Sequence, residues 1–295
     1  MSTGGVRLSI LAFRKPEKQG VNCYVSRIVE AIWAKSDGGA DVTLEAMITS
    51  NGNEPVNSLE IFLPLVVKDV KDITDTFLDD ELFENKARQS GYEVVDREKR
   101  KVKLSGILCD ISPVVVTCDV VDNYSKLSIN FKKNPVKPNE IRPFRLTFNT
   151  PTFAEKFRSY YRGTVTYEFC ISLYDIIREG SSKLRKLLEE HKERIIHCER
   201  IHIWLVLPDN AELMAVTPAA TWKIPHKIKG PLSKEEGKSR IALAWEPPGV
   251  LDVSPAWNEL RISGTYKRTS LRSITTGLAI VGLVLSITSL TLHFL

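Results

Sequence analysis

The chain has 295 residues, of which 43% are hydrophobic and 26% are charged. This length suits about two domains, and the ordinary globular composition excludes a wholly disordered chain. The formal net charge of +5 is spread over the whole length, so it does not favour nucleic acid as a partner.

The N-terminal residues lack the features of a secretory signal peptide. The apolar run at residues 8–13 is too short for a signal core, and Arg14 and Lys15 follow it at once. We therefore expect the body of the protein to stay in the cytoplasm.

Alternating apolar and polar residues predict β-strands through the first half of the chain. Residues 41–50 alternate, and a turn containing Asn51, Gly52 and Pro55 separates them from a strand at 56–63. The basic cluster at 97–101 is predicted to lie at a hairpin tip. The other candidate strands of this half are residues 24–34, 102–108, 113–121, 127–131 and 144–148.

An acidic amphipathic helix is predicted at residues 70–88, inside this β-rich half. Asp72, Asp75 and Asp79 would lie on its acidic side. That side is either an ordinary solvated face or a docking face for a basic protein partner.

The second half repeats the alternating pattern. The candidate strands of this half are residues 163–173, 195–207, 213–216, 240–245 and 259–266. Residues 181–194 begin with serines and carry leucines on one face, which predicts a second helix.

A weak internal duplication relates the two halves. Residues 59–64 resemble 201–208, and residues 126–131 resemble 240–245. We therefore predict a mainly β chain with two tandem antiparallel β-sandwich-like domains and minor helical insertions. The predicted domains are residues 1–150, which carry the acidic insertion, and residues 151–266.

Catalytic and metal-binding motifs are not recognisable. No C-x-x-C, nucleophile elbow, H-E-x-x-H or phosphate-binding glycine loop is present, and the five cysteines are expected to be reduced core residues. Metal-capable side chains gather locally at His191, His197, Cys198 and His202. On a strand only Cys198 and His202 would share a face, which is two ligands fewer than a structural zinc site needs. We therefore predict no catalytic residue, no metal site and no cofactor.

Residues 222–234 are basic with apolar residues between the lysines, and we interpret them as a loop. Such a loop could rest on anionic lipid headgroups, where each lysine contributes about 1 kcal/mol, or it could simply be exposed. Its lysines are Lys223, Lys227, Lys229 and Lys234.

The last 23 residues, 273–295, contain no Asp, Glu, Lys or Arg. As a helix they would span about 34 Å, enough to cross a hydrocarbon core of about 30 Å. We predict a single-pass transmembrane anchor whose body lies in the cytoplasm, because basic residues precede the segment. These membrane-flanking residues are Arg261, Lys267, Arg268 and Arg272.

Small residues four positions apart occur twice in the predicted anchor, at Ser273 and Gly277 and at Gly282 and Ser286. This spacing permits close helix packing, so the anchor could also self-associate.

Taken together, the sequence favours a tail-anchored scaffold that presents a β-rich interaction module to an unknown protein partner at a bilayer. Two other classes stay open. A membrane-bound enzyme would need a dispersed active site in a polar cleft, and a lipid-binding or lipid-sensing module would need an apolar pocket between the sandwich layers.

Overall fold

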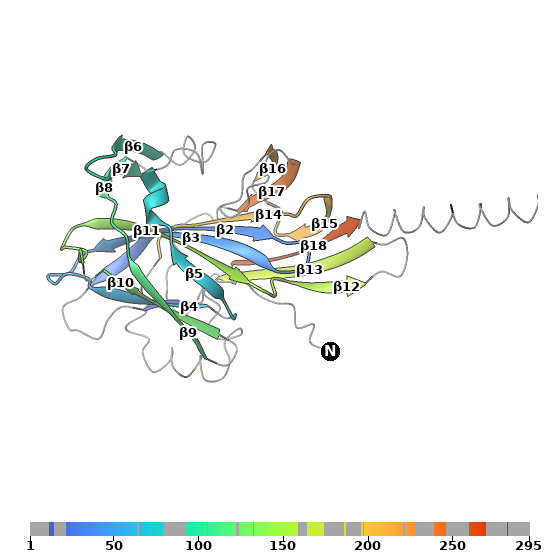
Figure 1. Ribbon diagram of the computed structural model, residues 1–295, viewed down its shortest axis with the longest axis horizontal. Helices are drawn as coiled ribbons and strands as arrows, with labels where there is room; N and C mark the ends of the chain where they lie inside the picture. The colour runs from blue at the N-terminus through green and yellow to red at the C-terminus, as the bar shows by residue number, and fades with distance from the viewer. Residues whose placement is uncertain are drawn as a thin grey trace, which may run out of the picture.

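The computed structural model of the chain describes residues 12–14, 22–63, 65–78, 92–104, 106–121, 124–131, 133–158, 164–173, 186, 196, 198–220, 222–227, 239–245, 260–269 and 282. Over these residues the protein is mainly β, as the sequence predicts, and its strands form four sheets (Figure 1). A short 3-10 helix, η1, spans Thr74–Leu78.

A seven-stranded central sheet runs through the molecule. In spatial order its strands are β16 (Trp222–Lys227), β17 (Ser239–Trp245), β14 (Ile201–Val206), β2 (Cys23–Ala34), β3 (Ala40–Ser50), β11 (Ile141–Thr150) and β5 (Lys68–Asp72). Neighbouring strands are antiparallel except β14 and β2, which are parallel.

Two four-stranded sheets and a small three-stranded sheet complete the fold. The first has the order β1 (Ala12–Arg14), β4 (Ser58–Leu63), β10 (Tyr124–Asn130) and β9 (Val115–Val121). The second has the order β12 (Ala154–Arg158), β13 (Thr164–Leu173), β18 (Leu260–Thr269) and β15 (Ala211–Thr217). The small sheet comprises β6 (Tyr92–Asp96), β7 (Lys101–Leu104) and β8 (Ile107–Asp110).

Strand order in the two halves matches strand for strand. The order β2-β3-β11-β5 corresponds to β12-β13-β18-β15, and the order β4-β10-β9 corresponds to β14-β17-β16. The sequence segments that resemble each other lie in β4 and β14 and in β10 and β17, which occupy equivalent places. This correspondence supports the internal duplication.

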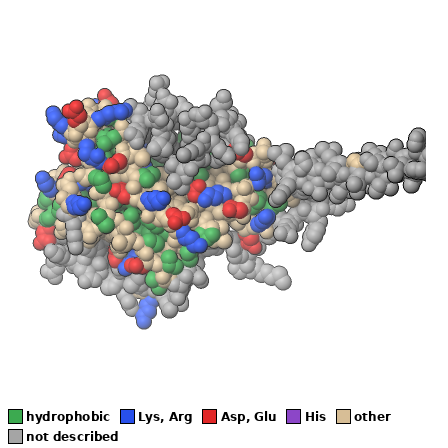
Figure 2. All heavy atoms as spheres, viewed as in Figure 1, with side chains coloured by type: hydrophobic (Ala, Val, Ile, Leu, Met, Phe, Trp, Pro, Cys, Tyr) green, Lys and Arg blue, Asp and Glu red, His purple; other side chains and the backbone are tan. Residues whose placement is uncertain are grey.

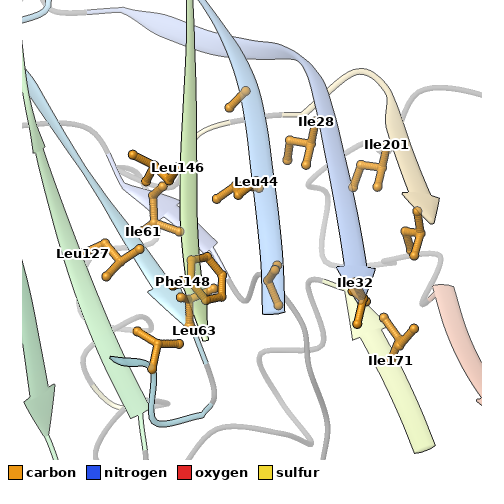
Figure 3. Packing of buried hydrophobic residues seen from close by; sticks show 14 of the residues in the cluster. Ile28, Ile32, Leu44, Ile61, Leu63, Leu127, Leu146, Phe148, Ile171 and Ile201 are labelled. Atoms are coloured by element: carbon orange, nitrogen blue, oxygen red, sulfur yellow. The ribbon is translucent and has the colours of Figure 1, made fainter. Parts of the chain in front are cut away.

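The two halves share one sheet and one core, because β2 of the first half pairs with β14 of the second. A single buried cluster extends from Ile61 and Leu127 through Leu44 to Ile32 and Ile171 (Figure 3). Excluding this apolar surface from water is the main driving force for holding such layers together.

A β-bulge in β2 adapts this strand to its neighbours. The register with β3 shifts between Val25 and Arg27, and Val25 and Ile28 are both fully buried in the same core cluster. A regular strand would point two residues of opposite parity to opposite faces, so the extra residue of the bulge is what brings both inward.

The predicted domain boundary, near Thr150 and Pro151, lies between β11 and β12. Here the β2–β3 turn contacts the connection: the backbone N–H groups of Phe153 and Ala154 both donate to the carbonyl of Gly38 at 2.8 Å. Gly38 has φ +100°, which a residue with a Cβ adopts only with strain. The Tyr167 hydroxyl of β13 also donates to the carbonyl of Ser36, so this turn is fixed to the second half.

Glu30 lies in the shared core without a hydrogen-bond partner. It is 1% exposed, and neither carboxylate oxygen is bonded. Its cross-strand partners are Leu44 on β3 and Ile203 on β14. Burial among aliphatic side chains disfavours the charged form and raises the pKa of Glu30 from 4.5 to about 8.

Three sequence predictions about secondary structure need correction. Residues 68–72, partly assigned to the acidic helix at 70–88, form strand β5, because they pair with the edge of β11. The rest of that range is the 3-10 helix at 74–78 and residues outside the described ones. The predicted strand 102–108 is a β-hairpin that turns at Gly106, where φ is +87°. Part of the predicted basic loop, 222–227, forms β16.

The predicted membrane anchor lies outside the described residues except for Gly282, which is helical and exposed. No helix among the described residues has both the length and the apolar character to span a bilayer. Of the predicted helix at 181–194 the structure describes only Lys186, which is helical.

Replacing Glu30 by Gln is expected to change how stability depends on pH. Glu30 ionises near pH 4.5 when unfolded but only near pH 8 when folded, so it costs stability progressively as pH rises through this window. The cost grows by about 1.4 kcal/mol per pH unit and levels off above pH 8. Chemical denaturation of wild type and Glu30→Gln at pH 5 and pH 8 measures the difference.

Glu93→Gln, at an exposed position on β6, is the matched control and at pH 8 should raise stability far less than Glu30→Gln does. A Glu30→Gln variant whose stability advantage is the same at both pH values would contradict burial as the cause.

Candidate functional site

An insertion distinguishes the first half of the chain from the second. The connection from β5 to β9 runs through residues 73–114, whereas the equivalent connection from β15 to β16 comprises only residues 218–221. The longer connection contains η1 and the sheet β6-β7-β8. In Figure 1 this sheet projects from the end of the molecule that lies away from the end of β18. Because the second half of the chain forms the equivalent strands without such an element, the insertion is not required by this strand order.

A separate apolar cluster packs the insertion onto the body. It joins residues of β7, β8 and η1 to Met47 of β3, with the half-buried Ile141 of β11 beside them. The buried members are Met47, Phe77, Val102, Leu104, Cys109 and Ile111. The inner face of the small sheet therefore packs in this apolar cluster, and its outer face is exposed to solvent.

Arg145 of β11 contacts η1 and holds it against the central sheet. Its guanidinium donates to the Thr76 hydroxyl at 2.8 Å, forms an ion pair with Glu45 at 2.9 Å, and lies 3.9 Å from the centre of the Phe77 ring. The Arg145 side chain is only 5% exposed. A buried arginine needs several partners to offset its desolvation, and these contacts supply them.

Two of the acidic residues predicted to form a docking face, Asp72 and Asp75, have partners within the chain. One oxygen of Asp72 accepts from the backbone N–H and hydroxyl of Thr74, and the other accepts from the Val114 N–H at 2.9 Å. Asp75 pairs with Arg100, whose Nε also donates to the Ile111 carbonyl. Asp79 lies outside the described residues. Asp72 thus connects the start and the end of the insertion.

The outer face of the insertion combines apolar side chains with charged side chains of both signs. Leu108 is 55% exposed and Val95 50% exposed, and Lys103 lies between Leu108 of β8 and Glu93 of β6. The predicted hairpin tip is confirmed, because residues 97–100 form the turn between β6 and β7. Figure 2 shows charged side chains gathered over this end of the molecule.

Within this turn, Asp96 is held in its ionised form. The backbone N–H of Lys99 donates to the Asp96 carboxylate at 2.9 Å, which lowers the pKa of Asp96. The Asp96 carboxylate therefore fixes a negative charge at the start of this exposed turn.

The predicted membrane-flanking basic residues fall on β18 where they are described. Arg261, Lys267 and Arg268 belong to this strand, and Arg272 lies outside the described residues. Lys267 forms an ion pair with Glu212 at 2.9 Å, and Arg268 Nε donates to the Asp209 carbonyl at 3.2 Å.

Of the predicted membrane-surface lysines, Lys223 and Lys227 lie in edge strand β16, and Lys229 and Lys234 are outside the described residues.

The histidine and cysteine cluster does not assemble within the described part of the chain, where no group of three metal-capable side chains occurs. Cys198 is buried and donates to the Arg200 carbonyl at 3.5 Å, and His202 lies in β14. His191 and His197 are outside the described residues. All five cysteines are free, as the sequence predicts, and burial raises the pKa of the Cys109 thiol to about 11.

Sequence reasoning overlooked Glu30 and Arg145. A signal for Glu30 was available, because it shares strand parity with Ile28 and Ile32 and so belongs to an apolar face. Arg145 occupies a similar position between apolar neighbours, but its partners on η1 are distant in sequence and could not be identified.

No protein-family model matches the chain, and no curated protein matches it in sequence. Among solved structures, an M1 zinc metallopeptidase mutant from Deinococcus radiodurans is 13% identical, with 83% of this chain and 43% of that chain covered and a TM-score of 0.37. A two-domain M1 zinc metallopeptidase mutant bound to L-tryptophan is 12% identical, with 90% and 46% covered and the same TM-score. Baculovirus P35 is 8% identical, with 85% and 97% covered and a TM-score of 0.24. The chain spans less than half of the metallopeptidase chains, and likenesses this weak carry no argument about function.

Asp72→Ala is expected to loosen the insertion. The substitution leaves the N–H groups of Thr74 and Val114 without their acceptor, which costs about 1–3 kcal/mol. Hydrogen exchange should become faster in β7 and β8 and stay unchanged in β13 and β18.

Asp75→Ala removes only an exposed ion pair with Arg100 and is the control, with an expected cost of about 0–1 kcal/mol. Equal exchange rates in the two variants would show that Asp72 does not hold the insertion.

Proposed function

We propose that the chain is a single-pass membrane protein whose β-rich body serves as an interaction module in the cytoplasm. The observation that carries this proposal is the segment 273–295, which contains no Asp, Glu, Lys or Arg and is long enough to cross a bilayer as a helix. The four basic residues that precede it favour a cytoplasmic body.

The position of the insertion supports an interaction role. Strand β18 ends at Thr269, shortly before the proposed anchor, and β6-β7-β8 lies toward the opposite end of the body (Figure 1). An anchor that continues from β18 would leave the insertion facing away from the bilayer. Exposed apolar side chains beside lysines at that end are the kind of surface that binds a partner with acidic and apolar groups.

The anchor is tested by membrane fractionation of the full chain and of a chain truncated after Ser270. The full chain should resist alkaline carbonate extraction, because a spanning helix leaves the bilayer only when the bilayer is dissolved. The truncated chain should be soluble, and protease added from the cytoplasmic side should remove the body of the full chain. A full chain that carbonate releases would refute the anchor.

The insertion is tested by site-specific photo-crosslinking in cells. A photoreactive residue replaces Leu108 on the insertion or, as the control, Met214 on β15, which is 57% exposed and so equally accessible. We expect a discrete crosslinked product from position 108 and none from position 214. Lys103→Glu, a charge reversal beside Leu108, should reduce the product at least tenfold if lysine attracts an acidic partner. Products of equal yield at both positions would contradict a partner site on the insertion.

A further inference from the structure

Edge strands are the places where a β-protein can pair with another chain, because one side of their backbone is unpaired. Among the residues that the structure describes, each of the three larger sheets ends in two such strands: β16 and β5, β1 and β9, and β12 and β15. Natural sheets blunt their edges with lysine, proline, bulges or short strands, so the devices present at each edge show which edges are protected.

Five of the edges carry at least one of these devices. Strand β16 contains Lys223, Pro225 and Lys227. Strand β5 contains Lys68 and Lys71, and its register with β11 shifts within the pairing.

The remaining protected edges are short or irregular. Strand β1 has three residues, and β12 has five, including Lys156 and Arg158. Strand β15 shifts register with β18 between Leu213 and Ala215.

Strand β9 carries none of these devices. Its sequence is Val-Val-Thr-Cys-Asp-Val-Val, it pairs regularly with β10 over all seven residues, and it contains neither lysine nor proline. Val115 is 53% exposed, Val120 51% and Val121 37%. Its single charge, Asp119, forms an ion pair with Lys126 of β10 at 3.5 Å.

The internal duplication makes this exception informative. Strands β9 and β16 occupy equivalent positions at the edges of equivalent sheets. Strand β16 carries a proline between two lysines, whereas β9 is regularly paired and has exposed valines near both of its ends. A sandwich of this topology can therefore have a protected edge here, and the first half lacks that protection.

The sequence of β9 is nearly palindromic about Cys118. We propose that β9 pairs antiparallel with β9 of a second copy of this chain, on a two-fold axis at Cys118, so that two four-stranded sheets join into one. In this register Cys118 faces its own copy. The other cross-strand pairs are Val115 with Val121, Val116 with Val120, and Thr117 with Asp119.

Self-complementarity selects a second copy over a foreign strand. A two-fold interface requires one surface to fit itself, and here each exposed valine meets a valine. Asp119 would meet Thr117, which can donate a hydrogen bond to its carboxylate, and no charge meets a like charge. An interface built on one seven-residue strand lies at the small end of protein interfaces, so the dimer should be reversible.

Pairing through β9 does not require the membrane anchor, and crosslinking through Cys118 detects contact at β9 directly. The full chain, purified in a non-ionic detergent, is treated with diamide, and dimers linked through Cys118 are measured on non-reducing gels. Facing residues on antiparallel strands have Cα atoms about 4.5–5.5 Å apart, within the range that a disulfide needs. The other four cysteines are buried, so Cys118→Ser should abolish the dimer band.

Two charge variants test the register. One double variant carries Val115→Lys and Val121→Lys, and the other carries Val115→Glu and Val121→Glu. In a homodimer each variant places two pairs of like charges opposite each other, so the yield of the crosslink should fall at least fivefold. Mixed together, the two variants oppose two opposite-charge pairs, and the crosslinked heterodimer should return to wild-type yield.

Met214→Lys, at an exposed position away from β9, is the matched control and should crosslink as wild type does. Thermal melting confirms that every variant is folded. The proposal is overturned if wild type gives no dimer through Cys118, or if mixing the Lys and Glu variants fails to restore it. The second result would place any contact between copies in a different register.

Discussion

The parallel pairing of β2 with β14 is the interaction on which the remainder of the fold depends. Strand β2 belongs to the first half and pairs with β3, and the same strand pairs with β14 of the second half within one sheet. Strand β4 of the first half is equivalent to β14 of the second. The neighbour of β4 is the three-residue β1, whereas the neighbour of β14 is the long strand β2. The second half therefore completes its sheet with a strand of its neighbour, and the two halves bury one continuous core.

Glu30 shows the cost of this arrangement. It lies on the core-facing side of β2, between aliphatic residues of both halves, where the sheet is continuous and water is excluded. An unpaired carboxyl at this position weakens the protein as it ionises, and no contact within the described core compensates it. Because burial raises the pKa of Glu30, we expect the folded protein to be more stable in mild acid than in mild alkali.

The two halves share one strand order but differ in the features that they expose. The first half carries the insertion and the unprotected edge β9, and the second half carries the short connection, the protected edge β16 and the strand that precedes the apolar C-terminal residues. Asp72 connects the two ends of the insertion, and the exposed side of the insertion carries apolar side chains beside charges of both signs. Surfaces for partners and contacts to the proposed membrane would then lie on different sheets of the body.

By itself the sequence determined the β-rich class, most strand positions, the basic hairpin tip and the apolar segment 273–295, because these depend on local alternation, turn residues and the absence of charge. The tertiary structure decided what local patterns do not encode. Residues 68–72 became a strand only because the edge of β11 was available to pair with them. The Asp72 carboxylate accepts from the N–H group of Val114, which is 42 residues away in the sequence. The pairing of β2 with β14 joins strands far apart in the chain, and its specificity comes from burying a common core, which no local segment carries.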